Sequence, residues 1–235
     1  MDTSVRPDQN KAGVSLEEYE TLKNRYDKLL DTLGAIVESR SLDGGPHIER
    51  IRSFTGVLAN EVMRSYPEYG LSPYVVHVFI ATSALHDIGK VTIPDNILFK
   101  PARLTREEFD FMKTHTTKGC ELLKNINGAL SNDYKRASYE ICRHHHEKYD
   151  GKGYPDGLRG DEIPISAQIV SVADVYDALV CERVYKDAFT KEQAFNMIVS
   201  GECGMFNPKL MDAFRKCAPG FEKVADDYRQ RRGEI

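Results

Sequence analysis

The amino-acid sequence predicts an all-α fold with about seven to nine helices. Several segments repeat apolar residues at spacings of three and four, which is the period of an amphipathic helix. Helix starts are marked by Ser72-Pro73 and by capping-box patterns at Thr105–Glu108 and Thr190–Gln193. No stretch shows the sustained alternation of apolar and polar residues that is typical of a half-buried strand.

Residues 16–37 form the first predicted helix, after a polar segment at residues 1–15 that we expect to be a flexible arm or linker. The pattern of this amphipathic helix is compatible with two arrangements. The helix either packs on its own domain or forms a two-stranded coiled coil, as at a homodimer interface or next to a sensor domain, a receiver domain or a separate regulator. Its repeating apolar positions are Leu16, Tyr19, Tyr26, Leu30, Leu33 and Val37.

The remaining elements follow from start signals and helix breakers along the chain. Pro46 suits the first turn of a helix at residues 47–66. The helix that begins at Ser72-Pro73 should end at His86-Asp87, with Gly89 as its stop. A glycine-rich loop is expected at residues 147–163, and a charged, frayed tail at 218–235. Further helices are predicted from residue 105, at 132–146, at 166–180, and from residues 190 and 208.

Composition excludes several classes of partner. The chain has 235 residues, of which 41% are hydrophobic, and a formal net charge of -4, so general affinity for nucleic-acid polymers is not expected. No run approaches the roughly 18 apolar residues of a membrane span. The five cysteines are odd in number, widely spaced and without a Cys-x-x-Cys pair, which predicts a reduced, cytoplasmic protein.

A histidine and an aspartate stand side by side at His86-Asp87 in an otherwise apolar run. Taken alone, the pair fits a helix-end histidine followed by a capping aspartate. Burying an unpaired ion is costly, however, and a divalent metal coordinates both imidazole nitrogen and carboxylate oxygen. Other candidate ligands lie at separate predicted helix ends, as in the metal sites of helical bundles. They are His47, His115, His145, His146 and Asp174.

These ligands are too numerous for one ion, and the two oxygens of Asp87 could bridge two ions. Cysteine is missing from the set, which favours Fe or Mn over a structural zinc site. Successive helical residues point about 100 degrees apart, so one of the three adjacent histidines at 144–146 should be a bystander. His77 is half a turn out of phase with His86, and we interpret it as structural.

The most specific stretch of the chain runs from His145 to Pro155 and contains Gly153-Tyr154-Pro155. Together with His86-Asp87, it resembles the HD-GYP family of cyclic di-GMP phosphodiesterases, which belongs to the HD superfamily of metal-dependent phosphohydrolases. The resemblance covers about residues 36–214 and implies an HD-type helical bundle with a catalytic domain at 38–217. It includes the blocks His47–Arg50, Leu85–Lys90, Val172–Leu179 and Arg183–Lys186, and the isolated His115.

The resemblance implies roles for particular residues. His47, His86, Asp87 and Asp174 resemble the ligands common to HD phosphohydrolases, whereas His115, His145 and His146 resemble those of a second metal, which leaves His144 as the bystander. Asp43 stands where some family members have a glutamate for a third metal, so two or three divalent ions are expected. Lys90 resembles a catalytic phosphate contact. The implied substrate-binding residues are Lys90, Gly153, Tyr154, Pro155, Arg183 and Lys186.

The family's chemistry implies that a hydroxide bridging the metals attacks phosphorus and opens cyclic di-GMP to linear pGpG, which a second cut would convert to GMP. Two alternatives stay open. One is a general HD phosphohydrolase that acts on nucleotides. The other is a receptor that binds the cyclic dinucleotide, hydrolyses it weakly and signals through the helix at 16–37.

Overall fold

The computed structural model describes residues 16–40, 47–126, 130–181 and 188–231. Within these ranges the regular structure is helical, which confirms the predicted all-α class, and the only β-type pairing is an isolated bridge between Asp150 and Arg159. No described helix is both long and apolar enough to cross a lipid bilayer. The elements are α1 (Leu16–Glu38), α2 (His47–Ser65), η1 (Pro67–Tyr69), α3 (Pro73–Ser83), η2 (Ile88–Thr92), α4 (Asp95–Leu98), α5 (Arg106–Lys113), α6 (His115–Ile126), α7 (Asn132–His144), η4 (Gly160–Glu162), α8 (Ile165–Val180), α9 (Lys191–Ser200) and α10 (Pro208–Arg231).

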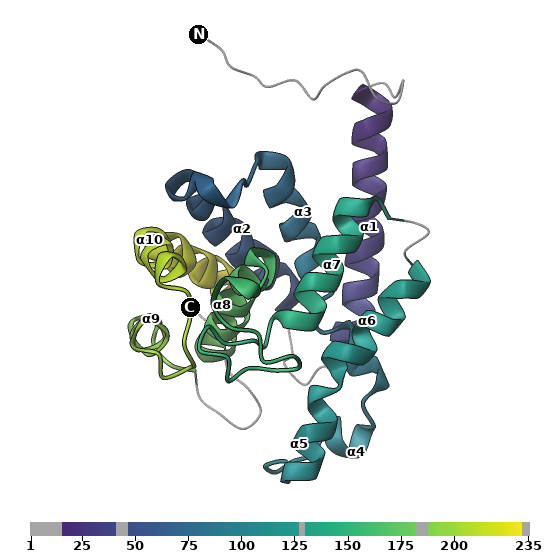
Figure 1. Cartoon of the computed structure of the whole chain (residues 1–235), viewed down its shortest axis with the longest axis vertical. Coiled ribbons are helices and arrows are strands. Elements are labelled where there is room, and N and C mark those ends of the chain that lie inside the picture. The colour runs from purple at the N-terminus through teal and green to yellow at the C-terminus, as the bar shows by residue number, and fades with distance from the viewer. Residues whose placement is uncertain (1–15, 41–46, 127–129, 182–187, 232–235) are drawn as a thin grey trace.

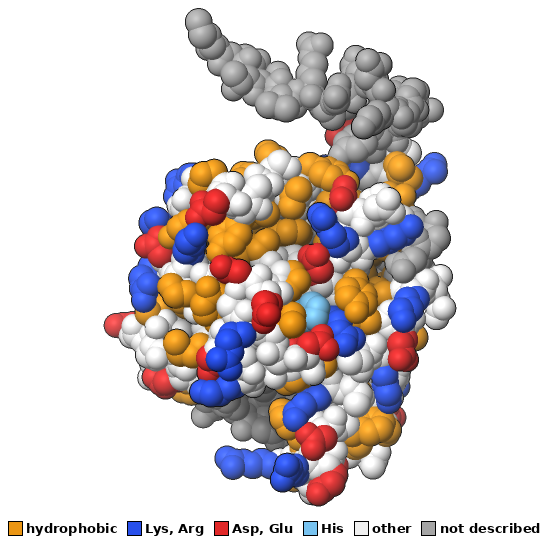
Figure 2. Space-filling view, in the orientation of Figure 1, with side chains coloured by type: hydrophobic (Ala, Val, Ile, Leu, Met, Phe, Trp, Pro, Cys, Tyr) orange, Lys and Arg blue, Asp and Glu red, His pale blue; other side chains and the backbone are white. Residues whose placement is uncertain are grey.

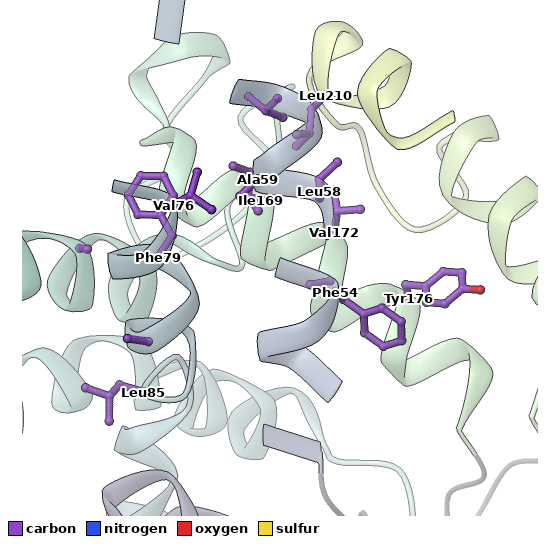
Figure 3. Packing of buried hydrophobic residues seen from close by; sticks show 14 of the residues in the cluster. Phe54, Leu58, Ala59, Val76, Phe79, Leu85, Ile169, Val172, Tyr176 and Leu210 are labelled. Carbon is purple, nitrogen blue, oxygen red and sulfur yellow. The ribbon is translucent and has the colours of Figure 1, made fainter. Parts of the chain in front are cut away.

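Helix α2 is the centre of the bundle and packs against α3, α8 and α10 (Figure 1). Its core face carries Phe54 and Leu58, both fully buried. Figure 3 shows Phe54 beside Tyr176 of α8, and their ring centroids are 5.2 Å apart. Burial of large apolar side chains is the main favourable term in folding, so this contact fixes α8 against α2.

Helix α1 has two apolar faces, of which one packs on the domain, as the first of the two predicted arrangements requires. One face packs on the domain, with Leu30 and Val37 buried. The other face exposes Leu22, Leu29 and Ile36, which are 45%, 37% and 55% exposed and follow one another at intervals of seven residues. Seven residues are two helical turns, so these side chains form one stripe along α1.

His77 is structural, as predicted, because its Nε2 lies 3.2 Å from Asp27 Oδ2 and thereby joins α3 to α1.

The helix that starts at Pro73 ends earlier than predicted. Ser72 caps it as expected, by accepting a hydrogen bond from the Val75 amide. Regular α-helix stops at Ser83, however, and residues 84–92 continue as tight turns and the short helix η2. In these turns several main-chain amides bond the carbonyl three residues earlier, as for His86 to Ser83 and Lys90 to Asp87. Gly89 therefore lies inside η2 and is not a helix stop.

The tail predicted at residues 218–235 is wrong for its described part, because helix α10 continues through Pro219 to Arg231. Two residues of this segment, Phe221 and Ala225, are buried although most of their neighbours in the sequence are charged or polar. They lie four residues apart and so face the same side of the helix. Phe221 stacks on Phe54 with a centroid distance of 5.0 Å and also contacts Phe214 and Tyr176. The structural domain therefore extends past residue 217.

We predict that Phe221→Ala lowers the free energy of unfolding by about 3–5 kcal/mol, because it empties a fully packed site between α2, α8 and α10. Chemical denaturation followed by circular dichroism would measure the change. Lys223→Ala, an exposed change on the same helix, should stay within about 0.5 kcal/mol. Equal stabilities for the two variants would contradict the packing of α10.

Candidate metal centre

A close approach between two backbones assembles the centre. Gly89 of η2 packs on the first turns of α6, where a Cβ atom at Gly89 would lie 1.8 Å from the His115 carbonyl oxygen and 2.7 Å from the Gly119 amide nitrogen. No side chain larger than hydrogen fits there. The contact brings the turn that carries Asp87 against the helix end that carries His115, and the closest distance between these side chains is 3.3 Å.

The first group of potential ligands comes from the turn just before η2, the start of α6 and the residues just after α7. It contains Asp87, His115, His145 and His146, which each offer one ligand atom within 4.8 Å of the others. Asp87 Oδ1 lies 3.3 Å from His115 Nε2 and 3.7 Å from His145 Nε2. Donors from three segments therefore converge on one point.

The second group comes from α2, the turn after α3, and α8. It contains His47, His86 and Asp174, again within 4.8 Å of one another. His86 Nε2 lies 3.9 Å from Asp174 Oδ1 and 3.3 Å from Asp87 Oδ2. The two oxygens of Asp87 thus point to different groups, Oδ1 to the first and Oδ2 to the second. This is the placement that a carboxylate shared by two ions requires.

Three histidines direct Nε2 toward the centre because their Nδ1 atoms contact the main chain. Each Nδ1 lies within hydrogen-bond distance of a main-chain carbonyl three or four residues earlier, and a carbonyl oxygen can only accept. In the neutral imidazole the proton is therefore on Nδ1, and Nε2 carries the lone pair that a metal would use. The pairs are His86 with Ser83 (2.8 Å), His115 with Met112 (2.8 Å) and His145 with Ile141 (3.0 Å).

Four buried atoms at the junction of the groups have no hydrogen-bond partner. A buried polar atom without a partner costs roughly 1–3 kcal/mol, and such atoms are uncommon in folded proteins. A divalent ion bound in each group would coordinate these atoms, so the residues present are suited to hold metal. The atoms are His86 Nε2, Asp87 Oδ1, His115 Nε2 and His145 Nε2.

The protonation states of the candidate ligands suit metal binding. Burial lowers the pKa of His115 to about 4, and burial together with the neighbouring His145 and His115 holds the pKa of His146 well below its usual value. Burial alone would raise the pKa of Asp87, but the Lys90 ammonium and His86 hold it well below its usual value. His115 and His146 are therefore neutral beside an ionised Asp87, and these are the forms that bind metal. Burial alone would lower the pKa of His86, but Asp87 raises it to about 9, so metal binding at His86 would displace a proton.

Most of this centre is inside the protein, and only a small patch of histidine is visible on the face shown in Figure 2. Lys90 lies at its edge, with Nζ 2.5 Å from Asp87 Oδ2 and the side chain 30% exposed. A phosphate bound at the two groups would therefore meet a cation beside the shared carboxylate.

The loop after α7 brings Tyr154 onto the first group. Its ring lies over His146 with a centroid distance of 4.7 Å and an interplanar angle of 30°. Pro155 follows in a cis peptide bond. Gly153 is needed for close packing, because a Cβ atom there would be 2.3 Å from the Glu147 Cα atom.

The buried Glu147 anchors this loop, a role that the sequence analysis missed. Its carboxylate accepts hydrogen bonds from the main-chain amides of Asp156, Gly157 and Leu158 at 2.8, 3.0 and 3.1 Å. His144 lies outside both groups, with Nδ1 3.5 Å from Asp156 Oδ2. Arg143 forms a bidentate salt bridge with the Asp156 carboxylate, and both N–O distances are 2.7 Å. The oxygens of Asp156 are therefore already paired within the protein.

Asp177 is a second residue whose role the sequence analysis missed. Its Oδ2 lies 2.7 Å from His47 Nδ1, while Arg50 donates to both of its oxygens at 2.5 and 3.1 Å. Burial alone would raise the pKa of Asp177, but the hydrogen bonds of His47 and Arg50 lower it to about 2. The carboxylate therefore orients His47 toward the second group. The available signals were the His-x-x-Arg spacing and the position of Asp177 one turn after Asp174.

Three predicted site residues, Asp43, Arg183 and Lys186, lie outside the described residues.

Comparisons with known proteins match this chain to one family. A family model described as HD domain matches residues 73–210. Two Vibrio cholerae proteins, named "Probable cyclic di-GMP phosphodiesterase" and "Cyclic di-GMP phosphodiesterase", are 41% and 38% identical over 212 and 211 residues. Each alignment covers 88% of this chain but only 48% and 43% of the relative, so the chain spans about half the length of the relatives it matches.

A solved structure from V. cholerae, titled as a cyclic GMP-AMP specific phosphodiesterase, has a TM-score of 0.58 at 19% identity. The match covers 87% of this chain and 52% of that one, and it shows the same fold. The family match includes His86-Asp87, His115, His145, His146 and Asp174. The chain belongs to the HD domain family, as the HD-GYP resemblance of its sequence predicted.

Proposed function

We propose that this chain is a metal-dependent phosphodiesterase that hydrolyses cyclic di-GMP to linear pGpG and, in a second cut, to GMP. The observation that carries the proposal is the position of Asp87, whose two oxygens point to two separate groups of potential metal ligands. The names of the relatives, cyclic di-GMP phosphodiesterases, support the substrate. Chromatography of cyclic di-GMP incubated with the metal-loaded protein tests it, and an unchanged substrate would refute it.

We propose that His47, His86, Asp87 and Asp174 hold one divalent ion and that Asp87, His115, His145 and His146 hold a second. The donors are nitrogen and oxygen without thiolate, which supports Fe or Mn. When bound, such ions supply Lewis acidity that activates water and polarises the phosphodiester. A third ion near Asp43 stays a prediction, because that residue is not described.

The chain's own groups would do the remaining work. Lys90 would neutralise charge on the phosphate oxygens, since its ammonium lies at the edge of the centre beside Asp87. Tyr154, stacked on His146, would provide an aromatic surface for a nucleobase, with Gly153 and Pro155 shaping the loop around it. Arg183 and Lys186 stay proposed phosphate contacts on the strength of their sequence pattern alone.

Two further proposals concern location and assembly. The wide spacing of the five cysteines and the lack of a Cys-x-x-Cys pair support a reducing compartment, and we place the protein in the cytoplasm. The exposed stripe of Leu22, Leu29 and Ile36 supports pairing of α1, either with α1 of a second copy or with the helix of a sensor or regulator. The general phosphohydrolase and receptor alternatives have no observation of their own in their favour.

Asp87→Ala should abolish hydrolysis of cyclic di-GMP and reduce metal content at both groups, because the variant removes the carboxylate between them. Activity should fall by more than about 100-fold, beyond the loss typical of residues that only support metal ligands. Asp227→Ala, which removes an exposed carboxylate on α10, is the control and should keep both properties. Retained turnover in Asp87→Ala would rule out the shared-carboxylate mechanism.

Asp177→Asn should weaken metal binding by about 10- to 100-fold, because His47 loses the charged partner that orients it. Competition with a chelator would measure the affinity. The variant also leaves Arg50 buried without a counter-charge, so its unfolding must be followed separately in metal-free protein. A folded Asp177→Asn protein with unchanged metal affinity would show that Asp177 serves only the fold.

A further inference from the structure

Helix α5 carries an aromatic side chain that the hydrophobic core does not explain. No residue of α5 is buried, and Figure 1 shows α4 and α5 projecting from one end of the bundle. Phe109 on this helix is 46% exposed. An exposed phenylalanine on a helix outside the core adds little to stability, so its surroundings indicate what it could serve.

Phe109 lies next to the loop that follows α7. Its ring centroid is 6.4 Å from that of Tyr154 in an edge-to-face arrangement, although 45 residues separate them in the sequence. Tyr154 in turn stacks on His146, a member of the first ligand group. Aromatic rings therefore continue from the candidate metal centre to the surface of α5.

A cation completes this arrangement. Lys113 Nζ lies 4.9 Å from the Phe109 ring centroid and 5.9 Å from that of Tyr154. It also bonds Asp110 Oδ1 at 2.6 Å. An ammonium group has three donors, so this bond leaves capacity for a ligand's acceptors.

We infer that Phe109 and Lys113 form a nucleobase subsite, in which a base stacks on the exposed part of the Phe109 ring and Lys113 donates to its acceptor edge. The inference rests on the proposed function, because the ligand is the second base of the cyclic dinucleotide, with the first on Tyr154. Stacking on an aromatic ring suits any base. Guanine presents two adjacent acceptors, N7 and O6, where adenine presents one acceptor and a donor amino group. A lysine at this edge therefore favours guanine.

The first test compares Phe109→Ala with Phe109→Tyr, which keeps the ring, and with Phe111→Ala on the same helix. Phe111 is the matched control because its ring faces Lys118 at 4.2 Å and is not part of the Phe109–Tyr154 contact. Phe109→Ala should raise KM for cyclic di-GMP, and Kd for a hydrolysis-resistant phosphorothioate analogue, by roughly 5- to 100-fold. Its kcat and metal content should stay unchanged. Phe109→Tyr and Phe111→Ala should bind as the original protein does.

The second test concerns base preference. Lys113→Met keeps most of the side-chain length and removes the donors. The ratio of kcat/KM for cyclic di-GMP to that for 3′3′-cyclic di-AMP should fall by about fivefold or more. A ratio that does not change would remove Lys113 from base recognition and overturn the guanine preference.

The outcomes separate this inference from the proposed function. An unchanged Kd in Phe109→Ala overturns the subsite, and so does a loss of kcat or metal content without a change in Kd, which would mean that α5 only supports His115. If the unaltered protein binds the analogue through Phe109 but does not hydrolyse cyclic di-GMP, the subsite stands and the proposed function fails. If it does not bind the analogue at all, both are wrong.

Discussion

The structure depends on one buried carboxylate, Asp87, which lies among several histidine side chains. Asp87 is buried and ionised, and its two oxygens point to two different sets of donors. A buried charge is costly unless it is paired, and Lys90 compensates only one of the oxygens, from the edge of the centre. The most economical explanation of the remaining buried, unpartnered atoms is a divalent ion in each set.

The helical bundle brings distant segments to this carboxylate. Gly89 and Gly119 let η2 and α6 approach within backbone contact, which places His115 beside Asp87. The aromatic core around Phe54 and Tyr176 fixes α8 against α2, and the same two helices carry Asp174 and His47. Asp177 joins them directly through His47. The same helix pairs thus provide both the core packing and the orientation of the ligands. The loop held by Glu147 adds the aromatic ring of Tyr154 beside the ligands.

Much of this was predictable from the sequence, because its local signals have local causes. The caps at Ser72, Thr105 and Thr190 form as predicted, and six histidine and aspartate candidates besides Asp87 converge on it in two groups. The misses have tertiary causes. The two core positions of the α10 tail, Phe221 and Ala225, lie among charged residues and are recognisable only from the partners they contact. Gly89 has the sequence signature of a helix stop, whereas its function is to admit another backbone.

The most direct test of the account is the metal content of the protein purified without oxygen and measured by plasma mass spectrometry against a chelator-stripped sample. The arrangement around Asp87 predicts at least two divalent ions per chain, bound together and lost together on stripping. A saturated protein that holds one ion or none would contradict it.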